Sequence, residues 1–334
     1  MIREHSGISL LRIIAAFLVV FIHVSPEVFS VMSNHWLGIN VMASASRISV
    51  PLFFMISGYL AFNENKITKI THFLKKKFSR ILIPLIAWSI FYIFYDETEV
   101  DIKILLNLLT ATPAHYHLWF FYTIIPMILL TPFFSSVVRK IDYTLFIYFI
   151  VIWLFLSLTP SLIQALIYFT NAEDPILKVG KAQLFISMSG YFLLGGFLRK
   201  MKFNLNNWVL ISAFLISTTA TIISTIIISN YLGSPSQAFF VYYSPFIAIA
   251  TVSIFLLFIK IDIQHSKATH LIKFISDLTL GVYLVHPIII DYFKIQILNS
   301  TNALSLLGMS FFIFIISLLI TLIISKTPIL KKTV

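Results

Sequence analysis

The sequence predicts an all-α, polytopic integral membrane protein that crosses a bilayer about ten times, with both termini on the cytoplasmic side. Three observations predict this fold class: the composition, a series of apolar runs of similar length, and an uneven distribution of basic residues between the loops. The chain has 334 residues, of which 59% are hydrophobic and 11% are charged, whereas a soluble domain carries about 25% charged residues. A single water-soluble core cannot account for so much apolar sequence.

Ten apolar runs bounded by polar or charged clusters supply the predicted spans. Each is roughly as long as a helix needs to cross about 30 Å of hydrocarbon. The third and sixth are short, which favours tilted or partly re-entrant helices. The first run has no small-residue cleavage site and is too long for a signal-peptide core, so we expect it to be retained. The runs cover residues 8–29, 41–62, 81–96, 117–137, 143–161, 183–198, 208–229, 238–259, 272–292 and 303–325.

The lysine and arginine residues outside these runs are concentrated in alternate segments of the chain. Because basic loops stay in the cytoplasm, this asymmetry places both termini inside and requires an even number of spans. It also explains the net charge of +11 without nucleic acid as a partner, since the basic residues are dispersed among short loops. One set of segments holds 18 of them: Arg3, Lys66, Lys69, Lys75, Lys76, Lys77, Arg80, Arg139, Lys140, Arg199, Lys200, Lys202, Lys260, Lys267, Lys273, Lys326, Lys331 and Lys332. The other set holds four: Lys103, Lys178, Lys181 and Lys294.

We expect one transmembrane domain over residues 1–334, because no soluble domain, internal repeat or flexible linker interrupts the chain. The sequence contains no cysteine, which excludes disulfides, thiolate metal sites and a cysteine nucleophile. Sequence motifs for nucleotide hydrolysis and zinc proteolysis are also absent. No metal is predicted.

The first run carries a cation and an imidazole on one helix face. Arg12 and His23 are eleven residues apart, which aligns them along a helix and separates them by about 16 Å. Arg12 lies near the cytoplasmic boundary, where its planar donors suit a phosphate-bearing ligand. His23 lies beyond the midplane and suits proton transfer. The alternative is that Arg12 extends to lipid headgroups and His23 satisfies a helix contact.

The second run carries the other intramembrane cation, Arg47, at about the depth of His23. A charge inside the membrane costs a few kcal/mol unless it finds a partner. Small serine and alanine residues surround Arg47, and Pro51 frees a backbone carbonyl, so this region suits a polar cavity. A structural ion pair is the alternative, for which Glu27 is the only nearby acid in these two runs.

A basic segment enters the third run. For Lys75 and Lys76, anchoring to the anionic cytoplasmic membrane surface is the favoured interpretation. Lys77 and Arg80 are one helical turn apart, so they are able to share a face with Arg12 over a phosphate.

The outer half of the membrane holds an excess of histidine and aromatic residues. An interfacial aromatic belt explains some of them, but lipid contact does not need so many hydrogen-bonding groups. Aromatic faces beside polar groups suit a sugar ring, which makes these residues candidates for binding a sugar substrate. The candidates are His115, His117, Trp119, Tyr122, Tyr283 and His286.

Four motifs together carry a family resemblance: Arg12-x10-His23, Ser46-Arg47-x3-Pro51 continuing to Ser57-Gly58-Tyr59, His117-Leu-Trp119-Phe, and Gly281-x-Tyr283-Leu-Val-His286-Pro287. On these motifs the chain resembles the acyltransferase family 3 membrane proteins, which O-acylate extracytoplasmic glycans, over nearly its whole length. The second and fourth spans look most like those of short bacterial enzymes that acetylate O-antigen or enterobacterial common antigen. The resemblance implies a multi-pass protein of the bacterial inner membrane.

The resemblance also implies a donor and roles for the site residues. The acyl donor would be cytoplasmic acetyl-CoA, a co-substrate, and the acceptor a glycan or lipid-linked glycan; membrane lipid is the other expected partner. Arg12 and His23 match the arginine and histidine that the family needs, while its third-span Arg-x-x-Arg is here Lys77-x-x-Arg80, which loses one bidentate contact. His23 would act as general base or as an acetylated nucleophile, and Arg47 or a tyrosine would stabilise the oxyanion.

Two other functions compete with acetyl transfer. One is transfer of succinyl, or another acyl group, to an exopolysaccharide. The other is transport or flipping of lipid-linked sugars, for which paired repeats with interrupted helices would be evidence. The sequence shows no such internal symmetry. The sequence predicts neither which glycan is the acceptor nor the oligomeric state.

Overall fold

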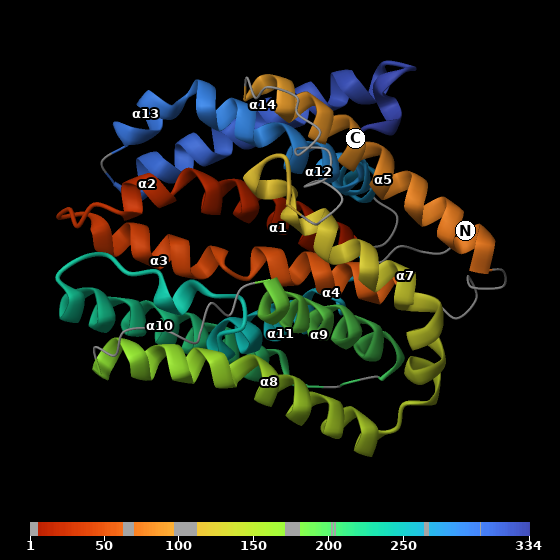
Figure 1. Ribbon diagram of the computed structural model, residues 1–334, viewed down its shortest axis with the longest axis horizontal. Coiled ribbons are helices and arrows are strands. Elements are labelled where there is room, and N and C mark those ends of the chain that lie inside the picture. The colour runs from red at the N-terminus through yellow and green to blue at the C-terminus, as the bar shows by residue number, and fades with distance from the viewer. Residues whose placement is uncertain are drawn as a thin grey trace.

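The structure, a computed structural model, describes residues 6–62, 70–96, 112–170, 181–201, 203, 205–263, 267–300 and 302–334. Within these residues all regular secondary structure is helical (Figure 1), which confirms the all-α class. The helices are α1 (Ser6–Val24), α2 (Pro26–Phe29), α3 (Trp36–Ser46), α4 (Ser49–Ala61), α5 (Ile70–Tyr95), η1 (Tyr116–Leu118), α7 (Trp119–Lys140), α8 (Tyr143–Thr170), α9 (Lys181–Lys200), α10 (Asn207–Leu232), η2 (Ala238–Phe240), α11 (Pro245–Phe258), α12 (Lys267–Tyr292), α13 (Lys294–Leu298), α14 (Ala303–Lys326) and η3 (Leu330–Lys332).

Each predicted apolar run coincides with one of these helices or with a consecutive pair. Within the described residues, seven segments are long and apolar enough to cross a membrane: Ser6–Val24, Trp36–Ala61, Tyr116–Lys140, Asn207–Leu232, Ala238–Phe258, Lys267–Tyr292 and Ala303–Lys326. Two shorter apolar helices, Ser79–Tyr95 and Tyr143–Ser157, match the third and fifth predicted spans. A polytopic membrane protein is therefore confirmed, while the count of ten crossings stays a prediction.

The second predicted run differs from the expectation in its interior. It begins at Trp36, and it is divided into α3 and α4 around Arg47. Pro51 explains the division, because proline has no N–H to bond the carbonyl of Arg47 four residues earlier, and its ring crowds that carbonyl. Arg47 therefore lies at a joint between two helices instead of within one.

Contacts at the two ends of the bundle join segments that the charge pattern places on the same side. At one end, the Gly7 amide donates to the Ile261 carbonyl (3.1 Å), which links the start of α1 to the connection before α12. At the other end, Lys294 Nζ lies 2.9 Å from Glu27 Oε1 and links α13 to α2. Both chain ends are marked in the right half of Figure 1. From the charge asymmetry we expect the end with the Gly7–Ile261 contact to face the cytoplasm. Six of the counted basic residues, Arg3, Lys66, Lys69, Lys103, Lys178 and Lys202, lie outside the described residues.

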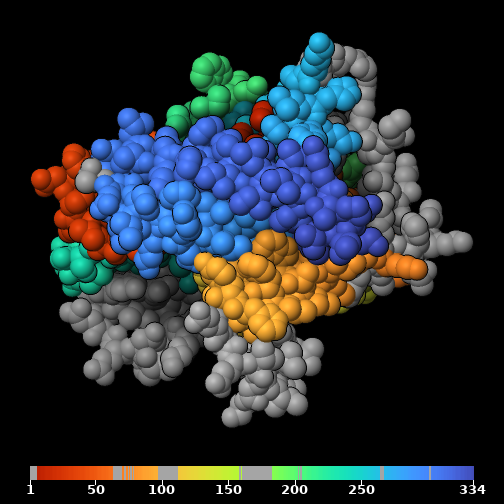
Figure 2. All heavy atoms as spheres, turned by 90° about the horizontal axis from the view of Figure 1, so that it is seen from above, coloured from red at the N-terminus to blue at the C-terminus, as the bar shows by residue number. Residues whose placement is uncertain are grey.

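Helix α1 is enclosed on two sides. Helices α12 and α14 lie side by side across the face seen in Figure 2, with α5 next to them. Both pack on α1, and a cluster that includes Phe21, Val282 and Ile313 fills the space between them. Helix α4 packs on another side of α1. As a result, the stripe from Arg12 to His23 lies among helices.

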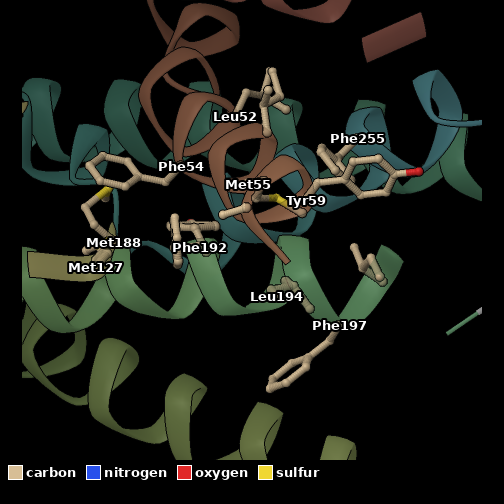
Figure 3. Close-up of a cluster of buried hydrophobic side chains, with 14 of the residues drawn as sticks. Leu52, Phe54, Met55, Tyr59, Met127, Met188, Phe192, Leu194, Phe197 and Phe255 are labelled. Atoms are coloured by element: carbon tan, nitrogen blue, oxygen red, sulfur yellow. The ribbon is translucent and has the colours of Figure 1, made fainter. Parts of the chain in front are cut away.

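Helix α4 is central to the largest hydrophobic cluster. Phe54 and Met55 from α4 and Phe192 from α9 are fully buried there (Figure 3). The two helices approach most closely at glycines: a Cβ on Gly58 would lie 1.8 Å from the carbonyl oxygen of Phe192, and one on Gly195 would lie 2.0 Å from that of Met55. Small residues permit such close contact between helix backbones.

Replacing Gly58 with alanine is expected to destabilise the protein by about 1–3 kcal/mol, because the added methyl group forces α4 away from α9. The midpoint of thermal unfolding in detergent measures the effect. Gly308→Ala in α14 is the matched control, since a Cβ at Gly308 meets nothing within 4 Å. Equal midpoints for the two variants would contradict the close backbone contact.

Candidate functional site

One cavity of about 780 Å³ connects the two parts of the site that the sequence predicts. Arg12 and His23 both line it, so the cavity follows the polar stripe of α1. Its other walls come from α4, α5, α7, α9 and α12, together with η1 and the segment between η2 and α11. Seven predicted site residues line this cavity: Arg12, His23, Lys77, Arg80, His117, Trp119 and Tyr283.

The predicted cytoplasmic half of the cavity is strongly basic. Five cations line it, namely Arg12, Lys77, Arg80, Arg199 and Lys273, against one acidic residue, Asp277. Arg12 Nη1 donates a hydrogen bond to Ser276 Oγ at 3.2 Å, which holds its guanidinium against α12. A cluster with this excess of positive charge attracts a polyanion and raises its local concentration.

Arg199 and Lys273 are site residues that the sequence analysis did not identify. Arg199 Nη1 donates to the Tyr59 carbonyl at 3.1 Å, and its guanidinium lies 4.8 Å from the centre of the Tyr59 ring. In the sequence both cations resemble ordinary charges at the cytoplasmic ends of spans. Only the packing of α9 and α12 around α1 and α4 reveals that they face the cavity.

The predicted outer half of the cavity is polar and aromatic. His23 shares it with His117, Trp119, Tyr242 and Tyr283. The Tyr283 hydroxyl donates to the His117 carbonyl, which ties α12 to η1. This half therefore offers an imidazole beside several flat rings, a combination that suits a proton transfer next to a sugar.

His286 lies behind His23. Its ring is fully buried, and its centre is 5.2 Å from that of His23. His286 Nδ1 is 3.1 Å from the Val282 carbonyl, and because a carbonyl only accepts, Nδ1 carries the proton. In the neutral ring Nε2 is then an acceptor, and among the described residues this buried atom has no hydrogen-bond partner. His286 does not line the cavity, so its position suits orienting His23 better than contacting an acceptor.

His115 and Tyr122 also lie outside the cavity lining. The ring of His115 stacks on Tyr92 with centres 4.2 Å apart, and its Nδ1 lies 2.8 Å from Nδ1 of His117. Burial lowers the pKa of His115 and so favours its neutral form. Tyr122 packs against a separate cluster that includes Trp88. In the part of the chain that the structure describes, no group of three or more His, Asp or Glu side chains is arranged to hold a metal ion.

Arg47 contacts aromatic residues and does not line the cavity. Its guanidinium carbon lies 4.3 Å from the centre of the Phe240 ring, and the guanidinium group interacts with the side chain of Tyr242. Glu27, the acid considered as its ion-pair partner, pairs with Lys294 instead. Arg47 therefore contacts the wall of the cavity at Tyr242.

Comparison with known proteins gives one match over nearly the whole chain. A family model described as an acyltransferase domain matches residues 5–326. A serine/alanine racemase from Enterococcus gallinarum is 29% identical over 131 residues, which cover 35% of this chain and 18% of the racemase. The chain thus matches less than a fifth of that protein's length, and the likeness says nothing of racemisation here. No solved structure matches.

Proposed function

Since the chain belongs to acyltransferase family 3, a family of membrane acyltransferases, we propose that it transfers an acetyl group from cytoplasmic acetyl-CoA to a hydroxyl group. The acceptor is a cell-surface glycan or its lipid-linked precursor, and the protein works in the bacterial inner membrane. One observation carries the proposal: a single cavity has a cluster of cations in one half and His23 among aromatic rings in the other.

The basic half supports a coenzyme A donor. Coenzyme A carries a pyrophosphate and a further phosphate, and planar guanidinium groups bind phosphate oxygens through paired hydrogen bonds. Arg12, Arg80 and Arg199 supply such groups, and Lys77 and Lys273 add point charges. From there the pantetheine arm extends along α1 for the roughly 16 Å between Arg12 and His23, which brings the thioester to His23.

His23 then acts on the acceptor hydroxyl. As a general base it removes the proton while the hydroxyl oxygen attacks the thioester carbonyl, and the imidazolium returns this proton to the departing thiolate. As a nucleophile it takes the acetyl group first and passes it to the acceptor in a second step. His286 packs behind this ring, with the two ring centres 5.2 Å apart, and limits its orientation in either case.

The outer half supports a glycan acceptor. Trp119 and Tyr283 present flat rings to the same space as His23, and the large apolar faces of such rings suit a sugar. The ring centre of His117 lies 5.2 Å from that of Tyr283, and the His117 carbonyl already accepts a hydrogen bond from the Tyr283 hydroxyl, so the wall of the acceptor site is held in place before substrate arrives.

Transfer of radiolabelled acetyl from acetyl-CoA to glycolipid, in membranes with and without this chain, tests the proposal. We expect an ester-linked label that depends on the chain. Unlabelled acetyl-CoA should compete better than succinyl-CoA; the reverse order would favour succinyl transfer to an exopolysaccharide. Absence of both transfer and coenzyme A binding would overturn the proposal and favour a transporter or flippase of lipid-linked sugars.

Replacing Arg199 with glutamine is expected to raise the KM for acetyl-CoA about tenfold and leave kcat unchanged, because a charge-assisted hydrogen bond to phosphate contributes about 1.5–3 kcal/mol. Lys200→Gln is the matched control. It removes the same charge from the neighbouring residue, which is exposed and does not line the cavity. Equal KM values for the two variants would exclude Arg199 from donor binding.

A further inference from the structure

We propose that the hydroxyl group of Tyr242 is the oxyanion donor of the acyl transfer and that Arg47 orients it from behind. The inference rests on the proposed function, because an oxyanion forms only if a thioester is attacked in the cavity. It assigns a role to a tyrosine that none of the sequence motifs includes, and it gives the buried charge of Arg47 a specific target.

Tyr242 and His23 both line the cavity, whereas Arg47 does not. The guanidinium group of Arg47 instead interacts with the side chain of Tyr242, with the guanidinium as the donor. A guanidinium group can only donate, so the Tyr242 oxygen must accept, and its own proton is directed to a different acceptor. A carbonyl oxygen of a substrate in the cavity is such an acceptor.

Tyr283, the other tyrosine that lines the outer half of the cavity, is already engaged. The hydroxyl of Tyr283 donates its proton to the carbonyl of His117, so it has none left for a developing oxyanion. Of the two tyrosines that line the outer half of the cavity, the hydrogen-bond pattern therefore selects Tyr242.

The ring of Tyr242 is also held in place. It stacks on Trp119 with centres 6.3 Å apart and planes inclined by 28°. Its carbonyl accepts a hydrogen bond from the Tyr191 hydroxyl at 2.8 Å. Fixed donors stabilise a developing charge more than mobile ones, because they need no reorganisation during the reaction.

Arg47 supplies the electrostatic part of the effect. Its guanidinium lies over Phe240, and among the described residues its buried Nε has no hydrogen-bond partner. A positive charge in such an apolar surrounding is weakly screened. By donating to the phenol oxygen it polarises the O–H bond, and chains of hydrogen bonds strengthen one another in this way.

The chemical step is as follows. The acceptor oxygen forms a bond with the thioester carbon, its proton passes to His23, and the carbonyl electron pair moves to the oxygen that receives the Tyr242 O–H. When this tetrahedral intermediate collapses, the carbon–sulfur bond breaks and the thiolate takes the proton from His23. If His23 is the nucleophile, an oxyanion forms twice on the same acetyl group: first when the imidazole nitrogen attacks the thioester, and again when the acceptor oxygen attacks the acetyl-imidazole. The thiolate that leaves in the first step takes the proton from the other ring nitrogen, and that nitrogen receives the proton of the acceptor hydroxyl when the imidazole leaves in the second step.

Tyr242→Phe tests the role directly, because it removes only the hydroxyl and keeps the ring stacked on Trp119 and the backbone carbonyl. Loss of one oxyanion donor lowers kcat about 100-fold or more, so we expect this decrease with less than about a threefold change in the KM for the donor. Tyr243→Phe is the matched control, since its side chain does not line the cavity, and it should retain the wild-type kcat.

A double-mutant cycle tests the link to Arg47. If Arg47 acts through Tyr242, Arg47→Gln should lower kcat by about tenfold in the wild type but change nothing further in Tyr242→Phe. A purely structural arginine would lower the amount of folded protein equally in both backgrounds. Additive losses of kcat would overturn the link.

The outcomes separate this inference from the proposed function. Full kcat in Tyr242→Phe, in membranes where the wild type transfers acetyl, would overturn the oxyanion role alone. Because every acyl-CoA has the same thioester carbonyl, the ratio of wild-type to Tyr242→Phe activity should hold for any acyl donor that is turned over. If the wild type turns over none, the proposed function and this inference both fail.

Discussion

Replacing His23 with alanine is expected to lower kcat for acyl transfer by at least about a thousandfold, while the affinity for acetyl-CoA stays within about twofold of the wild type. A positioned general base contributes about 10²–10⁴ in rate, and the loss of a nucleophile removes the reaction path altogether. Donor affinity should survive, because the cations proposed to bind the donor phosphates line the other half of the cavity.

Two measurements on the same membranes check this expectation: labelled acetyl-CoA binding at equilibrium, and transfer under saturating donor. His35→Ala is the matched control, because His35 is an exposed imidazole that precedes α3 and does not line the cavity. A His23→Ala protein that loses donor binding but keeps turnover at high donor concentration would contradict the assignment.

A quenching experiment on the wild type separates the two chemistries of His23. A transiently acetylated nucleophile should leave an acetyl group on the His23 peptide when the wild type is quenched with donor and without acceptor. A general base should leave none. The distinction does not affect the role proposed for Tyr242, because the acetyl carbonyl is attacked in both chemistries.

The fold could be predicted largely from the sequence because bilayer thickness sets helix length. The positions of Arg12 and His23 on one face were predictable for the same reason, since a continuous helix converts residue spacing directly into geometry. Along α1, from Ser6 to Val24, the structure keeps that helix unbroken, and both side chains line one cavity.

Neighbours on different helices were not predictable. Arg199, Lys273 and Tyr242 face the cavity because of how α9, α12 and the segment after η2 pack around α1 and α4. No spacing within a single helix contains that information, and apolar faces in a membrane protein do not distinguish lipid from protein neighbours. The opposite error occurred for His115, Tyr122 and His286. Their residue types and their depth in the membrane made them candidates for binding a substrate, but they lie outside the cavity lining.

Arg47 shows how a local break changes the assignment of a role. On an unbroken helix its depth near His23 suggests direct contact with substrate. Pro51 divides that helix, and the guanidinium lies over Phe240 and interacts with the side chain of Tyr242. The depth was predictable, but the direction of the side chain depends on a joint whose angle the sequence does not specify.

Replacing Arg12 with alanine is expected to weaken acetyl-CoA binding about 30-fold or more, with a much smaller effect on kcat once donor is saturating. The loss of a bidentate, charge-assisted contact with phosphate costs roughly 2–3 kcal/mol, which corresponds to this change in Kd. Arg12 is preorganised for the contact by its 3.2 Å hydrogen bond to Ser276.

Three companions make the Arg12 experiment decisive. Arg12→Lys keeps the charge but not the planar pair of donors, so its Kd should lie between those of the wild type and Arg12→Ala. Ser276→Ala should weaken binding only a few-fold, because it removes the support and not the contact. Lys77→Arg restores a second planar group one turn from Arg80 and should tighten donor binding. Unchanged donor affinity in Arg12→Ala, together with reduced turnover, would place the donor phosphates elsewhere and exchange the roles proposed for the two ends of the α1 stripe.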